Sequence, residues 1–99
     1  MTTLEAMDNL QEQIRLAPGA LIAARIRRAR RARGLSHDRL GAAIGGVSRQ
    51  HLIKLEKAQH RPRANLLTKI AEATGKPVDY FLVEEAGEPN PFPGETASA

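Results

Sequence analysis

The fold is decided by residues 36–56, which read SHDRLGAAIGGVSRQHLIKLE. Ser36 and Ser48 are residues of the kind that cap the N-terminus of a helix. Gly45-Gly46 stands between the two segments that these serines open. Glycine allows turn backbone with positive φ at little cost. The stretch therefore predicts two short helices joined by a glycine turn.

Each of the two predicted helices has an apolar stripe. Leu40 and Ile44 lie one helical turn apart on the first, and Leu52 and Leu55 form a similar stripe on the second. The second helix also carries a polar and basic set: Arg49, Gln50, Lys54 and Lys57. Arginine pairs well with guanine edges and glutamine with adenine edges in the major groove. The pattern is that of a helix-turn-helix that reads DNA.

The rest of the chain adds helices at both ends. Apolar periodicity predicts helices over residues 3–16, 20–33, 64–74 and 77–82. Gly34 and Gly75 are suited to end two of them. From residue 84 on, the sequence is acidic, rich in Pro and Gly, and without periodicity, which indicates disorder. We therefore expect an all-α protein with a leading helix and linker at 1–18, a DNA-binding domain at 19–83 and a disordered tail at 84–99.

The same periodicity assigns the core. In helix 20–33 the inward residues are expected to be Ile22, Ile26 and Ala29. The arginines of that helix, at positions 25, 27, 28, 31 and 33, are expected to project mostly to solvent or DNA. The later helices are expected to bury Leu66, Leu67, Ile70, Ala71, Val78, Phe81 and Leu82.

Basic residues are concentrated in the middle of the chain. All 15 Lys and Arg lie between Arg15 and Lys76, where only Asp38, Glu56 and Glu72 oppose them. The remaining acidic residues lie in the first 14 positions and after position 76. A basic body between acidic ends is the electrostatic pattern of a protein that binds a polyanion.

Several functional classes are disfavoured by composition. Without cysteine the chain has neither disulfides nor a cysteine-based zinc site, and its three histidines lack the clustered acids of a metal centre. No nucleophile–base pair or phosphate-binding glycine motif is visible, so we expect neither enzymatic activity nor a cofactor. No stretch is apolar enough to cross a membrane and no secretory signal is visible, which favours the bacterial cytoplasm.

Residues 20–82 resemble the Cro/lambda-repressor (Xre) family of helix-turn-helix domains. The motifs that carry the resemblance are Ile26-x3-Arg30-x3-Gly34-Leu35-Ser36, Val47-Ser48-Arg49-x2-Leu52-x2-Leu55-Glu56, Arg61-Pro62, Leu66-Leu67-x2-Ile70-Ala71 and Gly75-x2-Val78-Asp79. The resemblance implies a compact five-helix bundle that binds operator DNA, commonly as a homodimer. It also implies a buried ion pair between Arg30 and Glu56.

The chain departs from the family pattern at three positions. Gly46 is an extra residue in the turn, which puts the angle between the two motif helices in question. Gly41 replaces the usual alanine, at a cost of up to about 1 kcal/mol of helix propensity. Ala58 replaces the usual glycine after the second motif helix.

The helical wheel and the resemblance together give candidate DNA contacts. Four residues of the second motif helix are expected to face bases: Arg49, Gln50, Ile53 and Lys54. Five residues are expected to lie along the DNA backbone: His37, Ser48, Lys57, Arg61 and Arg63. Ser48 is above all a helix cap, and the backbone N–H of His37 rather than its ring is expected to face a phosphate.

The leading hypothesis is a transcription regulator, a repressor of phage or prophage type that binds double-stranded operator DNA as a homodimer. An antitoxin or adaptor that binds a partner protein through Leu4, Met7, Leu10 and Ile14 is the alternative. Packing of that apolar stripe on the domain's own core, or in a dimer contact, is the interpretation that we prefer. A nonspecific nucleoid-type DNA binder is the third possibility.

Overall fold

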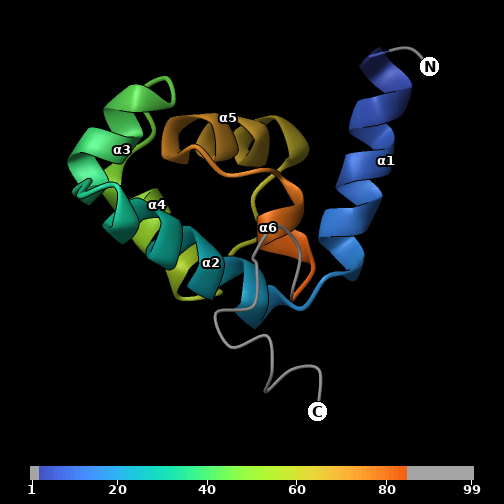
Figure 1. The fold of residues 1–99 in the computed structure, drawn as a ribbon, viewed down its shortest axis with the longest axis horizontal. Coiled ribbons are helices and arrows are strands. Elements are labelled where there is room, and N and C mark those ends of the chain that lie inside the picture. The colour runs from blue at the N-terminus through green and yellow to red at the C-terminus, as the bar shows by residue number, and fades with distance from the viewer. Residues whose placement is uncertain (1–2, 85–99) are drawn as a thin grey trace, which may run out of the picture.

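The computed structural model describes residues 3–84, with side chains described from Met7 on. The helices are α1 (Thr3–Leu16), α2 (Gly19–Ala32), α3 (His37–Ala43), α4 (Arg49–Glu56), α5 (Ala64–Thr74) and α6 (Asp79–Leu82). Residues 3–84 contain no strand, so the predicted all-α class is confirmed. Apart from Glu84, the predicted tail lies outside the described residues. Figure 1 shows α1 and the α3–α4 pair on opposite sides of α5.

The helix boundaries follow local signals in the sequence. The hydroxyl of Ser36 accepts a hydrogen bond from the N–H of Arg39 at 3.1 Å. Ser48 caps α4 in the same way, by accepting from the N–H of His51 at 3.1 Å. Gly75 ends α5 with a φ of 72°. The predicted boundaries hold to within two residues, the largest difference being that the last helix begins at Asp79 instead of residue 77.

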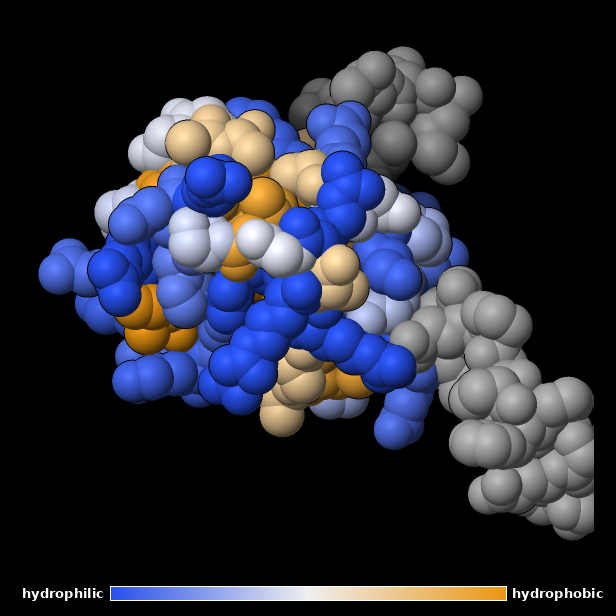
Figure 2. All heavy atoms as spheres, turned by 60° about the vertical axis from the view of Figure 1, so that its left-hand side comes forward, coloured by the Kyte–Doolittle hydropathy of each residue, from blue (hydrophilic) through white to orange (hydrophobic). Residues whose placement is uncertain are grey.

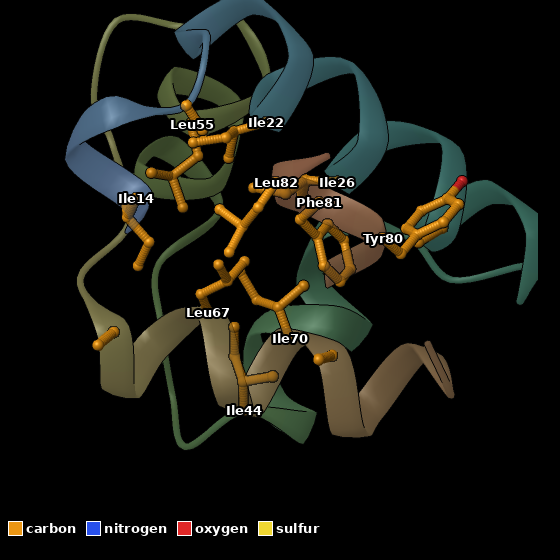
Figure 3. Close-up of a cluster of buried hydrophobic side chains, with 14 of the residues drawn as sticks. Ile14, Ile22, Ile26, Ile44, Leu55, Leu67, Ile70, Tyr80, Phe81 and Leu82 are labelled. Atoms are coloured by element: carbon orange, nitrogen blue, oxygen red, sulfur yellow. The ribbon is translucent and has the colours of Figure 1, made fainter. Parts of the chain in front are cut away.

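The core is built around α2, which contacts α4, α5 and α6. Figure 3 shows side chains from these helices and from α1 converging on one apolar cluster. The predicted inward residues of α2 are all buried. Burying one such leucine, isoleucine or phenylalanine stabilises the fold by about 1.5–3 kcal/mol. Tyr80, which the sequence did not assign to the core, is also buried and packs edge-on against Phe81.

The prediction that the arginines of α2 project to solvent or DNA is wrong for Arg25, which is only 7% exposed. Its guanidinium donates hydrogen bonds to the carbonyl oxygens of Tyr80, at 3.0 Å, and of Glu84. It also lies 4.7 Å from the centre of the Tyr80 ring, a cation–π distance. Position 25 shares a helix face with Ile22 and Ala29, so α6 covers it when it packs on α2.

The leading helix packs on the domain's own core, in agreement with the favoured interpretation of its apolar stripe. Ile14 is 1% exposed, and Met7 and Leu10 are partly buried against the same cluster. Helix α1 contacts α5. The side chain of Leu4 lies outside the described residues. The apolar face proposed to bind a partner protein is therefore largely occupied within the chain.

Two of the departures from the family pattern belong to one structural feature, the turn between α3 and α4. Gly45 and Gly46 have φ values of 100° and 90°, which glycine adopts without strain. The N–H groups of Gly46 and Val47 both donate to the carbonyl oxygen of Gly41, at 2.8 and 3.0 Å. A Cβ atom at position 41 would lie 2.1 Å from the carbonyl oxygen of Val47. The longer turn thus folds back onto α3, and only glycine at position 41 leaves room for it.

Substitution Gly41→Ala should destabilise the domain by about 1–3 kcal/mol, because the clash with backbone outweighs the gain in helix propensity. Urea unfolding measures the effect. Ala42→Gly is the matched control in the same helix, and its exposed position should cost no more than about 1 kcal/mol. A Gly41→Ala protein as stable as the wild type would contradict the packing described for this turn.

Substitution Ala58→Gly should have the opposite effect. Ala58 follows α4 with a φ of 62°, a conformation that costs an L-residue about 1–2 kcal/mol. Glycine removes this strain but adds about 0.5–1 kcal/mol of backbone entropy to the unfolded chain. We expect a net gain of up to about 1.5 kcal/mol, seen as a higher midpoint of thermal unfolding. A lower midpoint would show that the strain at Ala58 is negligible.

Candidate nucleic-acid interface

Helix α4 separates buried from exposed side chains along its length. Leu52 and Leu55 are fully buried, and the carboxyl side chain of Glu56 is 4% exposed. The opposite arc carries the predicted base-facing residues: Arg49, Gln50 and Lys54 are exposed, and Ile53 is partly exposed. Lys57, which follows the helix, is exposed as well. The helix therefore presents a mostly polar and basic arc to its surroundings, with Ile53 within it.

The side of the molecule that carries α3 and α4 is mostly hydrophilic. Figure 2 turns this side forward and shows small apolar patches between larger hydrophilic areas. Such a surface suits contact with a charged, hydrated partner better than a broad apolar interface.

The ion pair implied by the family resemblance is present beneath this surface. Arg30 of α2 donates from Nε to Oε2 of Glu56 at 2.6 Å, and from Nη2 to Oε1 at 3.1 Å. The remaining nitrogen, Nη1, donates to the carbonyl oxygen of Leu35 at 2.8 Å. Both charged side chains are less than one-tenth exposed. This bidentate geometry fixes the end of α4 against α2.

The ring of His37 joins this ion pair. Its Nε2 lies 3.2 Å from Oε1 of Glu56, and Nε of Arg27 lies 3.9 Å from the same oxygen. A carboxylate can only accept hydrogen bonds, so the imidazole is the donor. One carboxylate thus joins α2, α3 and α4. The sequence predicted a position for His37 along the DNA backbone but did not predict its contact with Glu56.

The surroundings of Glu56 favour its charged form. Burial alone would raise the pKa of Glu56, but hydrogen bonds from Arg30 and His37, and the charges of these residues, outweigh burial. The result is a pKa below the ordinary value of 4.5. The folded protein therefore holds Glu56 as a carboxylate at neutral pH.

Because folding lowers this pKa, the pair stabilises the fold fully above pH 4.5, and the stabilisation is lost as pH falls through the lower, folded pKa. Substitution Glu56→Gln should weaken this acid dependence. At neutral pH it should also cost about 1–3 kcal/mol, since Arg30 loses its charged acceptor. Urea unfolding from pH 3 to pH 7 measures both effects. Glu72→Gln is the control, because Glu72 of α5 is exposed. If the stability of the two variants depends on pH in the same way, Glu56 has no special role in acid stability.

Arg61 has a partner that the sequence did not predict. Its Nη1 donates to the carbonyl oxygens of Ile14 at 2.7 Å and Ala17 at 2.6 Å. The first carbonyl belongs to the last turn of α1 and the second directly follows that helix, where a cation is favourable. The guanidinium predicted to lie along DNA is therefore turned toward α1. Only the structure could show this, because the acceptors are more than 40 positions away in the chain.

Arg63 lies beside α4. It is exposed and occupies the N-cap position of α5. A surface hollow of about 460 Å³ is lined by His51, His60, Arg61, Arg63, Asn65 and Leu66. The rings of His51 and His60 have centres 6.0 Å apart. The hollow thus lies between α4, through the half-buried His51, and the loop that follows it.

Residues 3–84 contain neither a metal-binding cluster nor a membrane-spanning helix. This part of the chain contains no group of three or more His, Cys, Asp or Glu residues placed to hold a metal ion. It also contains no helix with the length and apolar character needed to cross a membrane.

Comparison with known proteins matches the same helices. The model of the helix-turn-helix family matches residues 26–81. Uncharacterized HTH-type transcriptional regulators from Rickettsia conorii and Rickettsia prowazekii are each 44% identical over 64 residues. These matches cover 63% of this chain but 50% and 48% of the relatives, so the chain spans about half the length of those curated relatives.

A smaller relative is covered almost completely. It is an uncharacterized HTH-type transcriptional regulator from Methanothermobacter thermautotrophicus, 38% identical over 64 residues that make up 91% of its length. The family model extends over more than half of this chain and includes α3, the glycine turn and α4. The chain belongs to the helix-turn-helix family, with the features of its Cro/lambda-repressor type.

Proposed function

We propose that this protein is a transcription regulator that binds double-stranded DNA sequence-specifically through α4. The observation that carries the proposal is the arc of exposed polar and basic side chains on a helix whose other face is buried. An α-helix fits the major groove, and residues at its N-terminal end reach the base edges. The relatives described as HTH-type transcriptional regulators support the same function.

Arg49 and Gln50 are the proposed base readers, because both are exposed in the first turn of α4. Arg49 would form two hydrogen bonds with guanine, and Gln50 two with adenine. Lys54 lies one turn further on, within reach of a base or a phosphate. Ile53 is partly exposed and offers an apolar contact to a thymine methyl group.

The DNA backbone would be held on both sides of α4. Ser48 and the N-terminal end of α3 at His37 lie before it in the chain, and Lys57 and Arg63 follow it. Phosphate contacts of this kind fix the position of a protein on DNA without selecting a sequence. We leave Arg61 out of this set because its guanidinium binds α1.

We further propose that two copies act together as a repressor of phage type in the bacterial cytoplasm. One helix of eight residues reads only a few base pairs, so a two-fold operator would supply the missing specificity. Occupation of a promoter by such a dimer would block transcription. The antitoxin or adaptor alternative is less favoured, since Met7, Leu10 and Ile14 pack on the core.

Selection of bound duplexes from a random pool at about 0.15 M salt tests the function directly. An enriched inverted repeat would support a sequence-specific dimer, whereas a single short site would support a monomer. No enrichment, with binding that weakens steeply as salt rises, would favour nonspecific binding over the regulator.

The same selection with Arg49→Ala and Gln50→Ala tests the two readers. Each variant should lose about 1–3 kcal/mol of discrimination at one base position while its fold is kept. Arg15→Ala is a control of equal charge, because Arg15 is an exposed residue of α1 that pairs with Glu12. If both reader variants select the wild-type sequence with unchanged stringency, Arg49 and Gln50 are not the readers.

A further inference from the structure

The segment between α4 and α5 is held by α1 on both sides of Arg63. On one side, the guanidinium of Arg61 binds the carbonyl oxygens of Ile14 and Ala17. On the other, the backbone N–H of Ala64 donates to Oε1 of Gln11 at 2.9 Å. Helix α1 thus receives a hydrogen bond from the residue two before Arg63 and from the residue directly after it.

These contacts satisfy backbone groups that helices leave without partners. The last carbonyls of α1 have no hydrogen-bond donor within their own helix, and the first N–H groups of α5 have no acceptor within theirs. Arg61 supplies a donor for the carbonyl of Ile14, and Gln11 supplies an acceptor for the N–H of Ala64. The end of α1 therefore receives a cap from the loop before α5, and the start of α5 receives one from α1, so the two ends are fixed relative to one another.

These contacts consequently hold the backbone around Arg63 in place. Pro62 and Ala64, its two neighbours in the chain, are both buried. Arg63 itself is exposed. It lines the hollow shared with His51 of α4, and it also lines a second hollow shared with Gln11 of α1. Arg63 therefore stands between the proposed recognition helix and the leading helix.

We propose that Gln11 and Arg61 are positioning residues for DNA binding: α1 holds segment 61–64 so that Arg63 meets a phosphate beside α4. The inference rests on the proposed function. It gives a role to a helix outside residues 26–81, the part of the chain that the family model matches. In this arrangement neither Gln11 nor Arg61 touches the nucleic acid.

The salt dependence of binding separates this role from a purely structural one. Each phosphate neutralised by a cation contributes about 0.9 to the slope of log K against log salt. Gln11 carries no charge, so its loss has no direct effect on that slope. If Gln11 positions Arg63, however, Gln11→Ala should remove the contribution of Arg63 and flatten the slope by about 0.9.

The experiment measures the affinity for one selected duplex between 0.05 and 0.2 M salt, a range of about fourfold over which phosphate contacts weaken strongly. The proteins are the wild type, Gln11→Ala, Arg63→Ala and the double variant. Gln13→Ala is the matched control, since Gln13 is an exposed glutamine of the same helix. We expect Gln11→Ala and Arg63→Ala to flatten the slope equally and the double variant to flatten it no further, while Gln13→Ala matches the wild type.

Arg61→Met provides a second, independent test, with circular dichroism to verify the helical fold of each variant. If Arg61 acts only through Arg63, the double variant with Arg63→Ala should have the slope of Arg63→Ala alone. A further flattening of about 0.9 would show that Arg61 contacts phosphate itself and would overturn the proposal.

Two further outcomes would separate failure of the positioning role from failure of the proposed function. Gln11→Ala with the affinity and slope of Gln13→Ala would overturn the positioning role while leaving DNA binding by α4 intact. A wild-type protein that binds no duplex would overturn the proposed function, and the positioning role with it.

Discussion

The buried carboxylate of Glu56 is the group on which the arrangement of α2, α3 and α4 depends. It accepts hydrogen bonds from Arg30 and His37, and a charge buried in this way is costly unless each lone pair finds a partner. Leu52 and Leu55 direct one face of α4 toward the core, but apolar contacts have little directional preference of their own. A bidentate ion pair has such a preference. Glu56 therefore fixes, together with these leucines, which arc of α4 faces outward.

The backbone at the two ends of α4 restricts the same helix in a different way. Before it, the turn at Gly45-Gly46 folds onto Gly41, whose lack of a side chain leaves room for the carbonyl of Val47. After it, Ala58 takes a left-handed conformation that most residues avoid. The extra residue in the turn is thus accommodated within α3 and the turn, since Ser48 still caps α4 and Glu56 still reaches Arg30.

The fold could be predicted well because its signals are local. Serine caps, glycine ends and apolar periodicity depend on residues within a few positions of each other, and they located every described helix. The contacts that the sequence did not predict involve long polar side chains. Arg25 binds carbonyls of the α6 region and Arg61 binds carbonyls of α1, and His37 binds Glu56. Backbone carbonyls are present at every residue, so no sequence pattern indicates which of them a distant arginine will meet.

The partners of these arginines also show that not every basic residue of the chain is available to bind DNA. Arg25, Arg30 and Arg61 hold carbonyl or carboxylate oxygens within the fold. A cation that is already paired at the protein surface or in its interior releases no counterion from DNA unless that pair is broken. At the proposed interface, electrostatic strength would therefore depend on the cations that α4 and its flanking loop expose, and the charge of the whole chain would overstate it. For this reason we expect the placement of a single exposed cation such as Arg63 to have a measurable effect on DNA binding.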